Sequence, residues 1–184
     1  MSLRSVVTPK ESVLIVWDVQ KGLVRSIFNR EEFLRGLNNV LEVARRTGIP
    51  TVFTKITPFP KGFEPFAMRA TGRRFQFTAE DLELEMSPKE GDIVMLKNTW
   101  SAFVGTNLEL LLRNSGRNVI LLTGIATEIG VETTARHAFA LGFLPVIVSD
   151  AVSSYNKEGH EKSLTNMRQF FPVVSSMELR DLLG

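Results

Sequence analysis

Short runs of apolar residues alternate along the chain with segments whose apolar positions recur at helical spacing. Most of the runs are apolar throughout instead of alternating with polar residues, which is typical of strands that are buried on both faces of a parallel sheet. Six strands are predicted in this way, at residues 13–18, 51–55, 93–97, 119–124, 145–150 and 173–176.

Amphipathic helices are predicted between these strands, because their apolar residues form stripes along one helix face. The stripes are Phe33, Leu37, Val40, Leu41 and Ala44; Leu108, Leu111 and Leu112; Val131, Ala135, Ala138 and Leu141; and Leu164, Met167 and Phe171. The alternation of strand and helix predicts an α/β fold with right-handed crossovers. We expect a Rossmann-like three-layer sandwich, in which a six-stranded, mainly parallel sheet has helices on both faces, in one domain over residues 1–184.

One connection interrupts this alternation. Residues 56–92 separate the second and third strands, and the segment is rich in Pro, Phe, Gly and Arg before a short helix predicted over 79–86. A connection of this length within a compact domain is usually functional, as a lid or as a partner surface.

Composition narrows the class of protein. The 184 residues contain no Cys, which excludes disulfides, thiolate metal sites and a cysteine nucleophile. The formal net charge of +2 is too balanced to indicate nucleic acid, and the local basic cluster of Arg69, Arg73 and Arg74 is interpreted as a solvated or interface loop. No apolar run has transmembrane length, and the first residues lack the features of a signal peptide, so we expect a cytoplasmic protein without membrane partners.

Polar side chains stand where the predicted strands end. Asp18 closes the first strand and Lys97 the third, and in an open α/β sheet the ligand crevice lies outside these carboxyl ends. The two side chains could therefore share one cleft. The alternative is that Asp18 is only a turn residue and Lys97 a solvated strand end.

No dinucleotide or P-loop fingerprint is present, and His137 and His160 lack the spacing of metal ligands. We expect no cofactor and no metal site.

Four segments together resemble one known family. "LIVWDVQ" ending around Asp18, "MLKNTWSAFVGTNL" with Lys97 and Phe103, "LLTGIATEIGVETTARHA" and "VIVSDA" are similar, in that order, to the isochorismatase-like (cysteine hydrolase) superfamily. The resemblance extends from about residue 12 to 180. It implies a catalytic Asp at Asp18, a Lys at Lys97 and the nucleophile's position at Gly130. It also implies a substrate site formed by Phe103 and by the turn with Ala126, Thr127 and Glu128, and a cis peptide at Ile125–Ala126.

Gly130 leaves two kinds of chemistry to consider. The amidases of the family form an acyl-enzyme on Cys, which Gly cannot do. True isochorismatases resemble this chain in having Gly there, and they cleave a vinyl ether, for which Asp18 could act as general acid with Lys97 as its electrostatic partner. Gly130 could also permit close approach of substrate to the helix N-terminus. We interpret Glu128 as the cap of that helix, with a role as a base as the alternative. The alternative is an amidase-like homologue that binds a small molecule without turnover. By resemblance we also expect a homo-oligomer, either a dimer or a tetramer.

Overall fold

The apolar runs form a single six-stranded sheet. The structure is a computed structural model that describes residues 2–72 and 76–184. The strand order is β3-β2-β1-β4-β5-β6, and all five neighbouring pairs are parallel. The strands are β1 (Ser12–Trp17), β2 (Thr51–Ile56), β3 (Ile93–Lys97), β4 (Val119–Ile125), β5 (Leu144–Ser153) and β6 (Val173–Val174).

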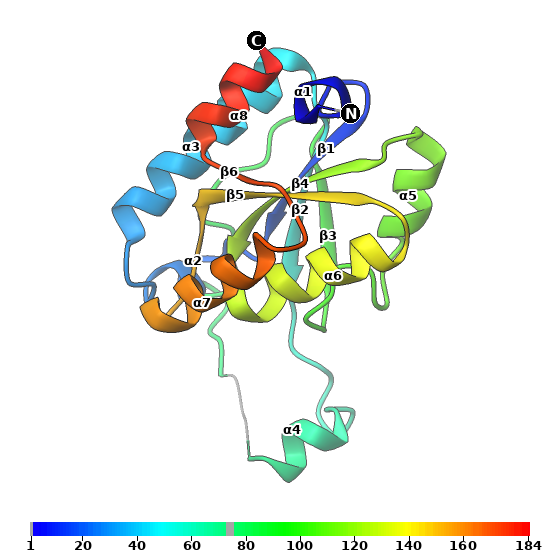
Figure 1. The fold of residues 1–184 in the computed structure, drawn as a ribbon. Coiled ribbons are helices and arrows are strands. Elements are labelled where there is room, and N and C mark those ends of the chain that lie inside the picture. The colour runs from blue at the N-terminus through cyan, green and yellow to red at the C-terminus, as the bar shows by residue number, and fades with distance from the viewer. Residues whose placement is uncertain (1, 73–75) are drawn as a thin grey trace.

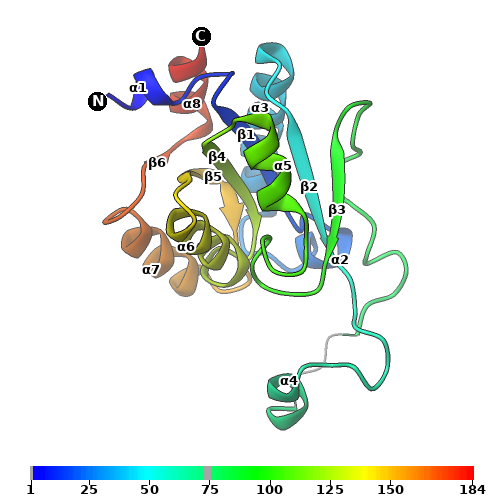
Figure 2. The same cartoon turned by 90° about the vertical axis from the view of Figure 1, so that its right-hand side faces the viewer.

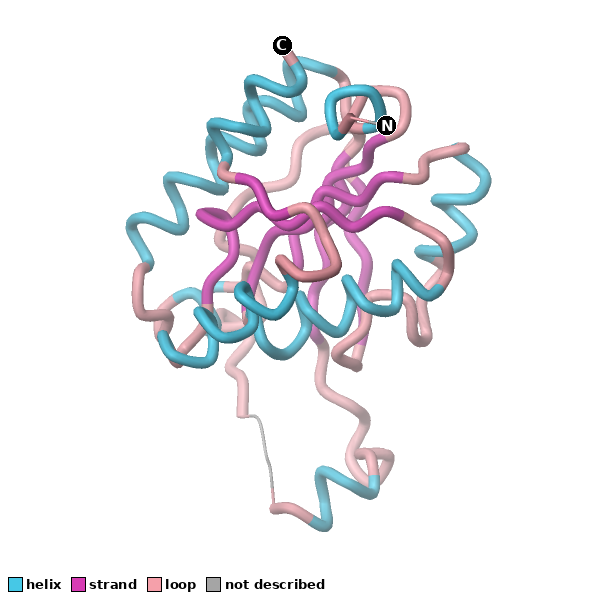
Figure 3. The backbone as a smooth tube through the Cα atoms, in the orientation of Figure 1, coloured by secondary structure: helices cyan, strands magenta, loops and turns pink. Residues whose placement is uncertain are grey.

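Helices cover both faces of this sheet. The helical elements are α1 (Leu3–Val6), α2 (Lys21–Val24), α3 (Arg30–Thr47), α4 (Phe66–Ala70), α5 (Leu108–Ser115), the π-helical turn η1 (Thr127–Val131), α6 (Glu132–Ala140), α7 (Lys157–Met167) and α8 (Ser176–Leu183). Helices α3 and α8 lie on one face, and α5, α6 and α7 lie on the other (Figures 1 and 3). The predicted three-layer α/β fold is therefore confirmed.

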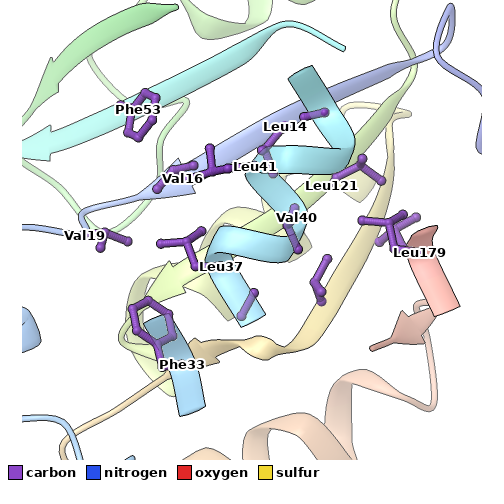
Figure 4. Close-up of a cluster of buried hydrophobic side chains, with 14 of the residues drawn as sticks. Leu14, Val16, Val19, Phe33, Leu37, Val40, Leu41, Phe53, Leu121 and Leu179 are labelled. Atoms are coloured by element: carbon purple, nitrogen blue, oxygen red, sulfur yellow. The ribbon is translucent and has the colours of Figure 1, made fainter. Parts of the chain in front are cut away.

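Strand β1 shows why the runs are apolar throughout. Leu14 and Val16 point into the cluster under α3, whereas Val13 and Ile15 point into the cluster under α5 and α6. Because successive side chains of a strand point to opposite faces, a central strand between two helical layers must be apolar at every position. Figure 4 shows the first cluster between the strands and the inner face of α3.

The long helix α3 follows from its stripe and its end signal. All five of its predicted stripe residues are buried, so the face identified from spacing is the face that packs on the sheet. The helix ends where Gly48 adopts a left-handed φ of 71°, and the N–H of Ile49 donates to the carbonyl of Ala44. Glycine adopts this conformation without the steric cost of a Cβ, which makes it the usual residue after a helix end.

The connection over 56–92 differs from its prediction. The helix predicted at 79–86 is wrong, because Thr78 and Asp81 form a hydrogen-bonded turn and Leu84 pairs with Gln20 in an antiparallel bridge. The helix found there instead is α4, which Figures 1 and 2 both show away from the sheet. Arg73 and Arg74 of the predicted basic cluster lie outside the described residues.

Within the part of the chain that the structure describes, no helix is both long enough and apolar enough to cross a membrane.

Candidate active site

Asp18 and Lys97 meet at the carboxyl edge of the sheet. Strand β1 ends at Trp17, and Asp18 follows it with an unusual positive φ of 47°. Lys97, the last residue of β3, donates from Nζ to Asp18 Oδ2 at 2.5 Å. The side chains are 0% exposed for Lys97 and 1% for Asp18. The structure therefore brings together the two residues that the sequence placed at the ends of separate strands.

Thr54 holds the carboxylate from the strand between them. Its hydroxyl donates to Asp18 Oδ1 at 2.6 Å and accepts from the backbone N–H of Asp18 at 3.1 Å. Lys97 Nζ also donates to the carbonyl of Thr99 at 3.0 Å. Thr54 was not predicted from the sequence, although a hydroxyl near the end of an apolar strand, between the strands that carry Asp18 and Lys97, was a usable signal.

Burial shifts the pKa of both groups toward their neutral forms. Removal from water raises the pKa of the Asp18 carboxyl, and the nearby ammonium of Lys97 opposes that rise only in part. Removal from water also lowers the pKa of the Lys97 amine, against the attraction of Asp18. These shifts bring the proton affinities of the two groups closer together, which makes Asp18 a better candidate proton donor than an exposed aspartate.

The space that a side chain at Gly130 would occupy is taken by the indole of Trp17. A Cβ built on Gly130 would lie 1.8 Å from Cη2, 2.0 Å from Cζ2 and 2.4 Å from Cζ3 of Trp17. The Trp17 ring is buried, and Lys97 Nζ lies 3.6 Å from its centroid. The interpretation that Gly130 leaves room for a substrate is therefore wrong in this structure, because the indole occupies that space. The sequence analysis had not connected Trp17 with Gly130.

The turn before Gly130 contains the cis peptide that the resemblance implies, at Ile125–Ala126. The carbonyl of Ala126 accepts from the backbone N–H groups of Ile129, Gly130 and Val131 at 3.1–3.2 Å. These three donors converge on one oxygen in the π-helical turn η1. The N–H of Gly130 is thus engaged within the protein and is not free to bind an anion.

The predicted substrate residues of the turn contact the end of β5, the residue that follows it and helix α7. Thr127 is buried, and its hydroxyl donates to the carbonyl of Ser153 at 3.1 Å and lies 2.8 Å from Nδ1 of His160. Glu128 accepts at Oε1 from the Ser154 hydroxyl at 2.6 Å. Glu128 lies in the first turn of η1, where the helix dipole favours a carboxylate, but its side chain bonds Ser154 instead of a backbone N–H of the turn. Glu128 Oε2 is buried without a partner among the described residues.

Phe103 packs within the protein. It belongs to the cluster under α5 and α6 and lies 6.0 Å from the ring of Phe143 and 5.2 Å from that of His137. Nδ1 of His137 is 2.8 Å from the Ser101 hydroxyl. In residues 2–72 and 76–184, no group of His, Asp or Glu side chains is arranged to hold a metal ion.

A pocket of about 580 Å³ opens at the carboxyl ends of β2 and β3. Its lining comes from the ends of β2 and β3 and from the connection that follows β2, and includes Thr57, Lys61, Arg69, Asn98 and Trp100. Neither Asp18 nor Lys97 lines it. Because Asn98 follows Lys97 directly, the pocket lies at the same edge of the sheet as the pair.

The chain and its fold have counterparts among known proteins. The isochorismatase domain family matches residues 12–178. An uncharacterized isochorismatase family protein of Bacillus subtilis, YwoC, is 33% identical over 171 residues, which cover 90% of this chain and 88% of the relative. The ureidoacrylate amidohydrolase RutB of Pseudomonas syringae is 27% identical over 206 residues, covering 92% and 82%. A solved isochorismatase family protein from Burkholderia thailandensis is 26% identical, with a TM-score of 0.82 over 95% of this chain and 96% of that one. The chain belongs to the isochorismatase family of hydrolases.

Proposed function

We propose that this chain, as one domain, hydrolyses a small molecule without a covalent enzyme intermediate, with Asp18 as proton donor. The observation that carries the proposal is the fully buried pair of Asp18 and Lys97, in which burial raises the pKa of the carboxyl. A buried carboxyl group with a raised pKa is better suited to act as a general acid than an exposed one. No Cys is present to act by the route of an acyl-enzyme.

The most concrete reaction is the hydrolysis of the vinyl ether of isochorismate. Asp18 donates its proton to the terminal vinyl carbon, which leaves an oxocarbenium ion. Water then adds to the cationic carbon and returns a proton to the Asp18 carboxylate. The resulting hemiketal breaks its bond to the ring oxygen, releasing pyruvate and the ring alcohol. The amine of Lys97 offsets the negative charge that Asp18 carries after it has donated its proton.

The pocket at this edge of the sheet supports an anionic substrate. Its charged lining residues are Lys61, Arg69 and Glu64, so cations outnumber the one carboxylate around a space of about 580 Å³. Isochorismate carries two carboxylates, which such cations attract. Because neither Asp18 nor Lys97 is exposed, turnover on this route requires the wall between the pocket and the pair to open.

Pyruvate release from isochorismate tests this proposal. We expect release by the unaltered protein and a loss of at least about 100-fold on Asp18→Asn, within the range that general acids contribute. Asp92→Asn is the matched control, because the same change there affects an exposed turn in which Asp92 accepts from the N–H of Lys89. Equal rates in the unaltered protein and Asp18→Asn would remove Asp18 from the mechanism.

The second candidate is a binding protein that keeps the fold without turnover. The observation that favours it is the complete burial of Asp18 and Lys97 together with the filled position at Gly130. Its ligands are expected among carboxamides, since the relative RutB is named as an amidohydrolase of ureidoacrylate. Isothermal titration with a carboxamide panel, combined with an ammonia-release assay, separates binding without turnover from catalysis.

We also propose that the chain forms a homo-oligomer, a dimer or a tetramer. Phe63 and Phe66 are 77% and 78% exposed on the connection that extends from the sheet (Figure 1). Aromatic side chains this exposed are common at interfaces between proteins. Light scattering on the unaltered protein and on Phe63→Ser/Phe66→Ser measures the change in mass, and a monomeric unaltered protein would contradict the proposal.

A further inference from the structure

We propose that Trp17 and Gly130 form a coupled pair, in which the indole takes the volume of the side chain that a nucleophile at position 130 would need. Trp17 is then the residue that closes the site to covalent chemistry, and it also positions the amine of Lys97. The inference concerns volume and contact, and it holds whichever substrate the protein takes.

The steric evidence is specific to the outer ring of the indole. The three atoms nearest the missing Cβ of Gly130 all belong to the six-membered ring of Trp17, at 1.8–2.4 Å. Carbon atoms that are not bonded to each other attract best at about 3.5–4.0 Å. Even the smallest side chain at position 130 would therefore overlap the ring, and a thiol would overlap it further.

Trp17 is also held from its backbone side. It pairs with Gly124 of β4, and a Cβ on Gly124 would lie 2.1 Å from the carbonyl oxygen of Trp17. The two glycines thus lie against the same residue, one at its main chain and one at its ring. A shift of the strand cannot relieve the overlap at Gly130 without bringing Trp17 into conflict with its neighbours.

Packing and a contact with Lys97 hold the indole of Trp17 in place. Its Nε1 is buried and has no hydrogen-bond partner among the described residues. Buried Trp nitrogens usually find a partner, so the contacts of the ring must determine where it lies. Lys97 Nζ lies 3.6 Å from the centroid, close enough for a cation–π attraction when the amine is charged. The same ring therefore touches Gly130 and the amine that binds Asp18.

It follows that positions 17 and 130 must change together. Gly130→Cys alone is expected to disrupt the site instead of creating a cysteine hydrolase. A thiol fits only where residue 17 is smaller, and it would then lie near Lys97. A neighbouring cation lowers the pKa of a thiol and raises the fraction of reactive thiolate.

The first test is a thermal-unfolding cycle with Gly130→Ala, Trp17→Ala and the double variant. We expect Gly130→Ala to lower Tm by more than about 5 °C in the unaltered background. In the Trp17→Ala background the same change should leave Tm unchanged or raise it, because alanine favours helix over glycine. Gly159→Ala is the matched control, since its Cβ would meet only the flexible end of Glu128 at 3.3 Å. Equal losses of Tm in both backgrounds would overturn the coupling.

The second test uses a milder background, which keeps the inference falsifiable if Trp17→Ala does not fold. Trp17→Phe removes the outer ring atoms but keeps an aromatic side chain. The chain has no Cys, so Gly130→Cys introduces the sole thiol. In Trp17→Phe/Gly130→Cys we expect a thiol that reacts with iodoacetamide at least about ten-fold faster than in Gly130→Cys alone, and a thiol pKa below about 8.5.

The thiol pKa separates a positioning role from a purely steric one. Thiolate absorbance against pH gives that pKa, and adding Lys97→Met to the double variant should raise it. If Gly130→Cys alone keeps the Tm of the unaltered protein and reacts as fast as the double variant, the proposed exclusion by Trp17 is wrong. If Lys97→Met leaves the pKa of the thiol unchanged, the position assigned to the amine is wrong.

Discussion

Replacing Lys97 with methionine removes the amine beside Asp18 and keeps an apolar side chain of similar length against Trp17. Asp18 Oδ2 loses its donor at 2.5 Å, whereas Oδ1 keeps the hydroxyl of Thr54 at 2.6 Å. Removing one partner of a buried ion pair costs about 3–5 kcal/mol, because the remaining charge is left without compensation. Asp18 can avoid most of that cost by keeping its proton, so the loss of stability must depend on pH.

The sign follows from the pKa of Asp18, which burial already raises above its ordinary value of 3.8. Without Lys97, the influences that lower it are reduced to the hydrogen bond from Thr54, so it rises further. Above pH 3.8 the folded variant then holds a proton that the unfolded chain has lost, and stability falls as pH rises toward the folded pKa. The slope is about 1.4 kcal/mol per pH unit between the unfolded and the folded pKa of Asp18, and stability is compared at about pH 5 and about pH 7.

The unaltered protein should not show this slope. Its pair holds one proton when folded, and the unfolded chain also holds one, on the amine of Lys97, so folding neither takes up nor releases a proton over this range. Urea unfolding followed by circular dichroism at both pH values measures the difference between Lys97→Met and the unaltered protein. In Asp18→Asn/Lys97→Met the difference should become independent of pH. A Lys97→Met variant whose stability parallels that of the unaltered protein, or rises with pH, would refute the argument.

Three further changes test the packing around the site by urea unfolding. Thr54→Val keeps the shape but removes the hydroxyl that bonds Asp18 twice, and should cost about 2–4 kcal/mol, since it leaves a buried N–H without a partner; no loss would mean that another group replaces the hydroxyl. Gly36→Ala places a Cβ 2.1 Å from the carbonyl oxygen of Asp150 and should cost at least about 2 kcal/mol, whereas a neutral effect would show that α3 can move off the sheet. Ser175→Ala removes the cap of α8 and should cost about 1 kcal/mol near neutral pH and less in acid, because the Ser175 hydroxyl helps to lower the pKa of Glu178; a cost that does not fall in acid would contradict this.

Much of the architecture was predictable because it is encoded over short distances in the chain. All six strands and the four apolar stripes correspond to observed elements, since the spacing of apolar residues directly reflects burial on one face or two. The connection over 56–92 was not predictable in this way. Its turn at Thr78 and the pairing of Leu84 with Gln20 depend on partners distant in sequence, which leave no period in the segment itself.

At the candidate site, the sequence by itself determined that Asp18 and Lys97 lie at the same edge of the sheet, because the carboxyl ends of parallel strands share one edge. Only the tertiary structure decided how that edge is filled. Thr54 bonds Asp18 because β2 lies between β1 and β3, and Trp17 fills the space over Gly130 because β1 ends beside the turn that follows β4. A glycine at such a position indicates that another group packs closely against the backbone. Strand order and register decide which residue that is, because they bring together residues that no local pattern connects.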